Sequence, residues 1–359
     1  MNKSGKLVLK DGSVYTGYFL GEAPGVGEVV FNTGVTGYQE VLTDPSYCGQ
    51  VVVMTYPLIG NYGVNDLYNQ SDKSYVRGYV VGELCDHPSN WRSEGSILDF
   101  LNREKVPCLY GVDTRAITRK IRDHGAMRGV IVPADISDAE LEKLLNQPEE
   151  KMVVAEATTK EIKHLPNKGF KVAFMDYGAK RSIIDSLVYY DCDLKIYPAY
   201  TTAKEVLADN PDGIVLSNGP GDPKDLPEII ASVKEFIASG KPIFGICLGY
   251  QLLCLALGAD TYKMKFGHRG VNHPVKDLEL NKVVITSQNH GYAVKEETLT
   301  GTGLVVTHRN VNDDTLEGVR LDGQPIFAVQ YHPEAAPGPD GHVYLFERFL
   351  DLMGGRKNA

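Results

Sequence analysis

The sequence lacks the features that mark membrane, secreted and nucleic-acid-binding proteins. Its 359 residues contain no run of about 18 apolar residues, so we expect no membrane-spanning helix. The stretch from Met1 to Ser13 has no long apolar core like that of a signal peptide, which predicts a cytoplasmic protein. The net charge is −9 and the acidic residues are spread along the chain, so nucleic acid is not expected as a partner.

Cysteines are few, and their spacing excludes two common uses. They form no Cys-x-x-Cys pair and no zinc or disulfide pattern; the six are Cys48, Cys85, Cys108, Cys192, Cys247 and Cys254. His268 and His273 lie close in sequence, but no cysteine or carboxylate set completes a site around them, so no metal is predicted. The chain also lacks the Gly-x-x-x-x-Gly-Lys-Ser/Thr loop, and we predict no cofactor on it.

The second half of the chain alternates apolar runs with amphipathic stretches. Strands are predicted in the first part at 171–175, 194–197, 213–217 and 242–246. Helices are predicted at 183–190, 226–237 and 248–257. Further strands are predicted at 283–286, 304–307 and 326–331, and a last helix is predicted at 345–352. Repeated strand–helix–strand units predict a central, mostly parallel sheet flanked by helices.

The first half consists of short strands and glycine-rich turns. Two apolar runs flank Asp11-Gly12-Ser13, which predicts a hairpin, and helices are expected near 97–104 and 115–123. The stretch 147–168 is charged and lacks apolar periodicity, so we place a boundary there. We therefore predict an α/β protein with an N-terminal mixed β-rich domain (1–150), a linker (151–170), a C-terminal domain (171–353) and a tail (354–359).

Gly245-Ile246-Cys247-Leu248-Gly249 lies where a predicted strand meets a predicted helix. A nucleophile on so sharp a turn needs small neighbours, because its backbone is strained and other loops come close. The first turn of a helix also offers free N–H groups and a dipole that favour a thiolate. The pentapeptide alone is equally consistent with a buried cysteine packed between two glycines.

A base and an orienting carboxylate follow at the end of the last predicted strand. His332 can accept the thiol proton and return it to a leaving amine, and Glu334 can hold the imidazole in one tautomer. Because the carboxyl ends of parallel strands meet at one edge of a sheet, we expect Cys247 and His332 to meet there. The amides of Leu248 and Gly219 are candidates for stabilising an oxyanion. A histidine at a strand end and a tight Gly-Pro turn are also common without such roles.

Three motifs resemble those of class I glutamine amidotransferases. They are Ser-Asn-Gly-Pro-Gly-Asp-Pro (217–223), Gly-Ile-Cys-Leu-Gly-Tyr-Gln (245–251) and Tyr-His-Pro-Glu (331–334). The whole chain is similar to the small subunit of glutamine-dependent carbamoyl phosphate synthetase. In the first half this likeness is carried by Phe-Asn-Thr-Gly-Val-Thr-Gly-Tyr-Gln-Glu (31–40), Thr-Asp-Pro-Ser-Tyr (43–47), Thr-Tyr-Pro-Leu-Ile-Gly-Asn-Tyr-Gly (55–63), Gly-Val-Asp-Thr-Arg (111–115) and Gly-Ala-Met-Arg-Gly (125–129).

The resemblance implies that the second half is a class I glutamine amidotransferase domain that hydrolyses L-glutamine. It implies a triad of Cys247, His332 and Glu334, with Gly219 and Leu248 as the oxyanion amides. It also implies glutamine contacts at Ser46, Gly219, Gly221, Leu248, Gln251, Asn289, Gly291 and Tyr292. It further implies a heterodimer with a large ATP-binding subunit. That partner would use MgATP and bicarbonate, receive ammonia through an enclosed passage, and serve pyrimidine and arginine biosynthesis.

Two other functions remain open at this stage. A stand-alone cysteine hydrolase or glutaminase with the same triad would leave the first half of the chain without a role. A non-catalytic docking subunit would make the complete set of cysteine, histidine and glutamate a coincidence. Glutamate release would separate the docking role from the other two functions, and dependence on a partner would separate the stand-alone hydrolase.

Overall fold

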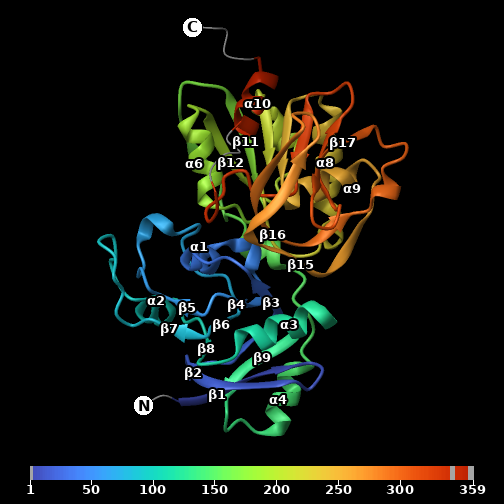
Figure 1. Ribbon diagram of the computed structural model, residues 1–359. Helices are drawn as coiled ribbons and strands as arrows, with labels where there is room; N and C mark the ends of the chain where they lie inside the picture. The colour runs from blue at the N-terminus through green and yellow to red at the C-terminus, as the bar shows by residue number, and fades with distance from the viewer. Residues whose placement is uncertain (1–2, 340–343, 355–359) are drawn as a thin grey trace. The chain divides into compact units, whose positions relative to one another are not determined.

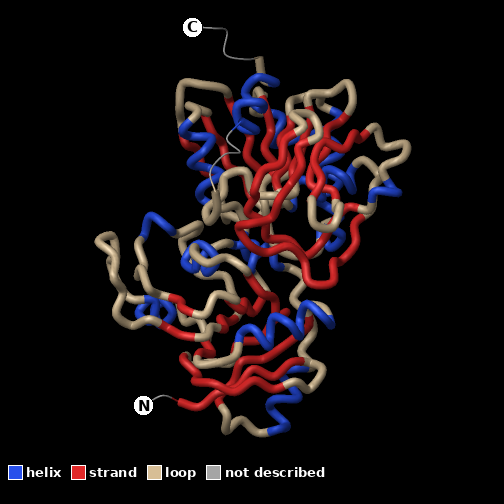
Figure 2. Tube along the Cα trace, in the orientation of Figure 1, coloured by secondary structure: helices blue, strands red, loops and turns tan. Residues whose placement is uncertain are grey.

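The computed structural model describes residues 3–339 and 344–354, which fold as two compact units (Figures 1 and 2). The first unit takes Met1–Glu150 and Lys265–Gly270, and the second takes Lys151–Met264 and Val271–Ala359. The sequence pattern did not predict that the short stretch Lys265–Gly270 groups with the first unit. Within the described residues, no helix is both long enough and apolar enough to cross a membrane.

A closed barrel of seven strands, in the order β1-β2-β8-β6-β4-β3-β9, forms the centre of the first unit. Its strands are β1 (Lys3–Leu9), β2 (Val14–Leu20), β3 (Gly25–Asn32), β4 (Gln50–Met54), β6 (Gly78–Val80), β8 (Cys108–Tyr110) and β9 (Met127–Pro133). The predicted hairpin is confirmed, because β1 and β2 pair antiparallel around a turn in which Gly12 has a φ of 86°. Closure of the barrel, which leaves no free sheet edge, was not predicted.

Among the described residues the first unit has four helices, and all but the first of these begin at a side-chain cap that the sequence supplies. They are α1 (Tyr38–Thr43), α2 (Ile97–Arg103), α3 (Thr114–His124) and α4 (Asp138–Leu145), with 3₁₀ turns at Pro45–Tyr47 and Asp66–Tyr68. Two short strands, β5 (Leu58–Ile59) and β7 (Glu83–Leu84), pair apart from the barrel. Ser96 caps α2 and Asp113 caps α3 by accepting a backbone N–H three residues on. The predicted helices near 97–104 and 115–123 are therefore confirmed.

A ten-stranded sheet runs through the second unit, in the order β10-β12-β11-β13-β14-β19-β18-β17-β15-β16. The strands are β10 (Lys163–Leu165), β11 (Lys171–Asp176), β12 (Asp193–Pro198), β13 (Gly213–Leu216), β14 (Ile243–Ile246), β15 (Thr261–Asp277), β16 (Lys282–Val294), β17 (Leu304–Asn310), β18 (Leu316–Leu321) and β19 (Ile326–Val329). The five strands β12, β11, β13, β14 and β19 are parallel neighbours. The prediction of an α/β protein with a central, mostly parallel sheet is confirmed.

Helices cover both faces of this sheet (Figure 1). On one face, α6 (Arg181–Tyr189) and α10 (Tyr344–Leu352) pack with Val172 and Phe174 of β11. On the other face, α7 (Ala203–Ala208), α8 (Pro227–Ala238) and α9 (Leu248–Ala256) pack with Ala173 and Met175 of the same strand. The alternation of burial along β11 follows from side chains that point to opposite faces.

The segment 151–170, predicted to be a linker, contains secondary structure of the second unit. It holds α5 (Val153–Ala157) and the strand β10, which pairs antiparallel with β12 at the sheet edge. Thr158 donates from its hydroxyl to the Asp176 carbonyl at 2.6 Å, which ties the segment to the end of β11. Its elements are too short to show apolar periodicity, which is why the pattern indicated a linker. Of the predicted tail, residues 355–359 lie outside the described residues.

Candidate active site

Cys247 lies on a sharp turn between β14 and α9. Its φ of 53° and ψ of −101° lie in a region that costs a non-glycine residue about 1–3 kcal/mol, and its side chain is 2 % exposed. A Cβ on Gly249 would lie 2.2 Å from the Leu216 carbonyl oxygen, and one on Gly245 would lie 2.9 Å from the Ala328 Cβ. The two glycines are therefore needed because neighbouring strands come close to the turn.

His332 follows β19, the parallel neighbour of β14, so it lies at the same sheet edge as Cys247. Its backbone N–H donates to the Ser287 carbonyl at 2.9 Å. Its Nδ1 lies 2.7 Å from Glu334 Oε1, an acceptor when ionised, which assigns the ring proton to Nδ1. Its Nε2 is buried and makes no hydrogen bond to protein in the described part of the chain. Nε2 is thus the nitrogen that can exchange a proton with a thiol.

The charges around His332 set its proton affinity. Burial disfavours the imidazolium, but the nearby Glu334 carboxylate outweighs burial, and the pKa of His332 rises to about 10. The Cys247 thiol adds to the increase in the pKa of His332. At neutral pH His332 is therefore an imidazolium, with protons on both ring nitrogens. Its positive charge stabilises negative charge on an adjacent sulfur.

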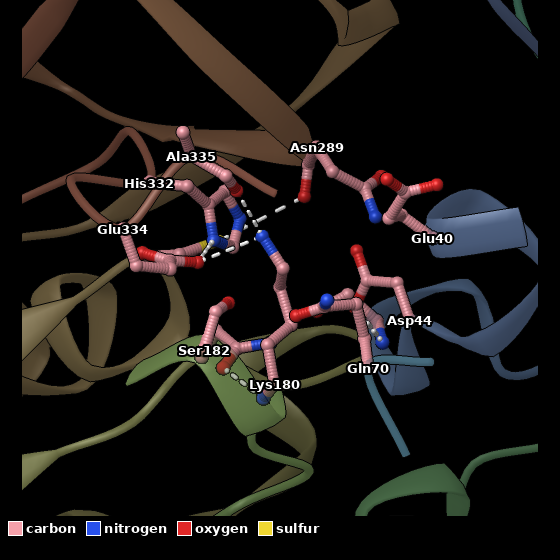
Figure 3. Close-up of polar contacts among 12 residues, drawn as sticks. Glu40, Asp44, Gln70, Lys180, Ser182, Asn289, His332, Glu334 and Ala335 are labelled. Carbon is pink, nitrogen blue, oxygen red and sulfur yellow. Dashed lines mark hydrogen bonds and ion pairs between the residues drawn. The ribbon is translucent and has the colours of Figure 1, made fainter. Parts of the chain in front are cut away.

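Lys180 completes this cluster and was not found from the sequence. It is 2 % exposed, lies directly before α6, and its Nζ is 2.8 Å from Glu334 Oε1 (Figure 3). The same Nζ donates to the Ala335 carbonyl. Burial alone would raise the pKa of Glu334, but Lys180 and then His332 lower it to about 2. A lysine four residues past the end of β11 was the only signal in the sequence, and it belongs to no motif that we recognised.

The two predicted oxyanion amides belong to residues at or near the nucleophile turn, since a Cβ on Gly219 would lie 2.8 Å from Leu248 Cδ2. Leu248 is the first residue of α9, where backbone N–H groups have no helical partner. Gly219 follows β13, and a Cβ there would lie 2.4 Å from the Tyr177 carbonyl oxygen. Among the described residues, neither amide donates a hydrogen bond. Both N–H groups are thus available to a ligand oxygen.

Most residues predicted to contact glutamine belong to the second unit. Gln251 lies one turn beyond Cys247 in α9, and its Nε2 donates to the Tyr292 carbonyl at 3.0 Å. Asn289 and Gly291 lie with Tyr292 on β16, and the Asn289 carbonyl is 3.8 Å from Cys247 Sγ. Strand β16 therefore brings three predicted contacts beside the nucleophile turn.

Three other predictions concern residues outside α9 and β16. Gly221 is exposed on the turn after β13 and has a φ of 92°. Ser46 lies in the first unit, in the 3₁₀ turn after α1, where its backbone N–H donates to Asp44 Oδ1 at 2.9 Å. Its contact with glutamine stays a prediction. His268 and His273, which we did not predict to bind a metal, belong to different compact units.

Two family models and one solved structure match parts of the chain. A family model described as "Glutamine amidotransferase class-I" matches residues 173–352, and one described as "Carbamoyl-phosphate synthase small chain, CPSase domain" matches residues 7–131. A solved structure of a glutamine amidotransferase from Thermotoga maritima matches with a TM-score of 0.38 and 16% identity, covering 46% of this chain and 77% of that one.

Curated relatives match over nearly the full length. The carbamoyl phosphate synthase small chain of Clostridium acetobutylicum is 50% identical, covering 97% of this chain and 99% of the relative. That of Bacillus cereus is 52% identical, covering 97% and 95%. That of Caldanaerobacter subterraneus is 50% identical, covering 97% and 96%. The chain belongs to the carbamoyl phosphate synthase small chain family.

Proposed function

We propose that this chain is the glutaminase subunit of a carbamoyl phosphate synthetase, and that it hydrolyses L-glutamine through Cys247, His332 and Glu334. The observation that carries the proposal is the arrangement at one sheet edge. A strained cysteine directly precedes a helix, and the neighbouring strand is followed by a histidine whose Nδ1 is held by a buried carboxylate at 2.7 Å. Class I amidotransferase chemistry needs this set of a nucleophile, a base and an orienting group.

The thiolate of Cys247 attacks the carboxamide carbon of glutamine. The N–H groups of Gly219 and Leu248 stabilise the negative oxygen that forms, because they make no hydrogen bond within the described chain. The tetrahedral intermediate then collapses, and His332 gives its Nε2 proton to the departing nitrogen, which leaves as ammonia. A γ-glutamyl thioester remains on Cys247.

Water completes the cycle. The now neutral Nε2 of His332 takes a proton from water, and the hydroxide attacks the thioester carbonyl. Glutamate leaves, and the sulfur and imidazolium regain their starting charges. Glu334 is ionised in the resting site, where Lys180 and the protonated His332 lower its pKa to about 2, and Lys180 remains beside it when His332 is neutral. It acts by fixing the imidazole and stabilising its positive charge.

The ammonia passes to a separate chain. The sequence has no Gly-x-x-x-x-Gly-Lys-Ser/Thr loop, so the use of MgATP and bicarbonate is assigned to a large partner subunit in a cytoplasmic heterodimer. The names of the relatives, which are small chains, support this division. Because glutamine hydrolysis without a consumer would waste glutamine, the isolated chain is expected to be slow until the partner binds.

Glutamate release tests the proposal and separates it from its rivals. Release is measured with the chain alone and with the large subunit, MgATP and bicarbonate, and Cys247→Ser serves as the control. Stimulation by the partner that is lost in Cys247→Ser supports a coupled amidotransferase. Equal turnover without the partner would favour a stand-alone hydrolase, and no release in either condition would favour a docking role.

A further inference from the structure

A glutamine outside the triad holds one of the predicted substrate contacts. Gln330 lies directly after β19 and two residues before His332, and it is fully buried. Its backbone N–H donates to the Glu317 carbonyl at 2.8 Å, which fixes its main chain. Its side-chain Oε1 lies 2.9 Å from Nε2 of Gln251. Neither the mechanism above nor the predicted glutamine contacts include Gln330.

The carboxamide of Gln251 makes two hydrogen bonds, both from its nitrogen. Nε2 donates to the Tyr292 carbonyl at 3.0 Å and to Gln330 Oε1 at 2.9 Å. A primary amide nitrogen has two N–H groups, so both are used. No described residue donates to Oε1 of Gln251, which leaves this oxygen as the group that can meet a ligand.

Only one orientation of these amides is consistent with the donors and acceptors. The Tyr292 carbonyl can only accept, so the Gln251 atom that faces it must be the nitrogen. The second N–H of Gln251 then points at Gln330, which must present its oxygen. Turning either amide alone would place two donors or two acceptors against each other, so Gln330 and Tyr292 together fix the Gln251 amide.

Gln330 keeps this orientation at a cost. Its own Nε2 is buried and makes no hydrogen bond within the described residues, which costs about 1–3 kcal/mol. If the side chain served only to fill space, an apolar residue of similar length would avoid this cost. The chain keeps an acceptor facing Gln251 instead.

We propose that Gln330 is a positioning residue for substrate selection, which acts by turning Oε1 of Gln251 toward the glutamine pocket. The inference rests on the proposed function and on Gln251 as a substrate contact. An oxygen that only accepts suits the α-ammonium group of a free amino acid, which only donates. The pair Gln251–Gln330 therefore selects L-glutamine over amides of the same length that lack an α-amino group.

Binding of two ligands to the full chain tests this role. The ligands are L-glutamine and glutaramate, which has the same carboxamide and carboxylate but no amino group, and Cys247→Ser prevents turnover. Gln330→Met, similar in length but without the acceptor, is expected to raise the Kd of L-glutamine by about tenfold or more. It is expected to change the Kd of glutaramate by less than about threefold. Titration calorimetry measures both constants.

Two variants control for folding and for the chemical change. Gln324→Met makes the same exchange at an exposed position before β19 and is expected to leave both constants unchanged. Gln330→Glu retains an acceptor and is expected to retain the preference for L-glutamine.

With Cys247 intact, Gln330→Met is expected to raise KM for L-glutamine while kcat stays within about threefold.

The outcomes are distinct. An equal loss for both ligands in Gln330→Met, an unchanged Kd for L-glutamine, or loss of the preference in Gln330→Glu would each overturn the positioning role. Binding of neither ligand by the Cys247→Ser chain, together with no glutamate release by the unmodified chain and partner, would instead overturn the proposed function, and this inference with it.

Discussion

Lys180 and Glu334 form an ion pair that is almost completely shielded from solvent, with 2.8 Å between Nζ and Oε1. The side chains are 2% and 0% exposed, and the same carboxylate oxygen also bonds His332 at 2.7 Å. A buried carboxylate remains ionised only when nearby positive charge offsets its lost hydration. Lys180 therefore helps to keep Glu334 in the ionised form that orients the catalytic histidine.

Loss of the Lys180 charge is expected to lower both stability and activity. In Lys180→Met the Glu334 carboxylate loses one of its two cationic partners, and removal of one member of a buried pair costs about 3–5 kcal/mol. We also expect a lower kcat, because the pKa of Glu334 rises when Lys180 is removed. Urea unfolding and glutamate release measure the two effects.

A surface lysine supplies the matched control. Lys224 pairs with Asp260, but the two side chains are 45% and 36% exposed. Lys224→Met should therefore cost less than about 1 kcal/mol and leave glutamate release unchanged. Equal effects of Lys180→Met and Lys224→Met would contradict the role assigned to Lys180.

The histidine pKa predicts a loss of stability at alkaline pH. The folded pKa of His332 is about 10 against an ordinary value of 6.5, so the folded state binds this proton more tightly. The resulting stabilisation is complete below about pH 6.5 and is lost as the pH rises toward 10, at up to about 1.4 kcal/mol per pH unit. In Glu334→Gln the carboxylate that raises the pKa of His332 is gone, so the loss should be smaller. Urea unfolding at several pH values between 6.5 and 10 compares the two proteins, and identical slopes would refute the coupling.

Acid also lowers the stability of the folded state, in this case through Glu334. Its folded pKa of about 2 lies below the ordinary value of 4.5, so its stabilisation is present above pH 4.5 and is lost as the pH falls toward 2. Glu334→Gln removes this titration. The difference in unfolding free energy between the original chain and the variant should therefore shrink as the pH falls from 4.5 to 2.

The oxyanion role of Gly219 predicts a specific loss of rate. In Gly219→Ala the new methyl group would lie 2.4 Å from the Tyr177 carbonyl oxygen and 2.8 Å from Leu248 Cδ2, so the turn has to move. Displacement of one oxyanion donor is expected to lower kcat by about 10²–10³-fold. Gly95→Ala is the control, since its methyl group would meet nothing closer than 3.6 Å. A full rate in Gly219→Ala would exclude its amide from the mechanism.

Backbone strain at Cys247 predicts that glycine destabilises the protein less than alanine at this position, which is the reverse of the order within a helix. Because its φ is 53°, Cys247→Gly should be more stable than Cys247→Ala by about 1 kcal/mol. Cys254 is also buried but lies within α9, where glycine costs about 1 kcal/mol relative to alanine. Cys254→Gly should therefore be the less stable of its pair. The same order at both positions in thermal unfolding would show that the turn is not strained.

The parts of the site that follow strand ends could be predicted from the sequence. Cys247 and His332 each follow an apolar run, and parallel strands bring such ends to one edge, as β14 and β19 do. Lys180 could not be predicted in this way, because its partner Glu334 lies 154 residues away and the pairing depends on tertiary packing. Gln330 was missed because a buried glutamine at the end of an apolar run has no distinctive spacing.

In the fold, too, the elements fixed by neighbouring residues could be predicted, whereas the features that depend on distant segments could not. The hairpin around Gly12 and the helices near 97–104 and 115–123 could be predicted because the structure of such short elements depends on local residues, and in the structure Ser96 also caps α2 locally. Closure of the barrel and the long strand β15, which spans Thr261–Asp277, depend on pairing between distant segments. The polar residues along β15 hide its strand character, since its burial does not alternate regularly.

Covalent labelling with 6-diazo-5-oxo-L-norleucine, a glutamine analogue that alkylates catalytic nucleophiles, tests the central claim most directly. The chain has six cysteines, so peptide mass spectrometry can show which of them reacts. The account predicts a single adduct on Cys247, protection by L-glutamine, and no adduct in Cys247→Ser. An adduct on another residue, or labelling of Cys247 that L-glutamine does not slow, would contradict it.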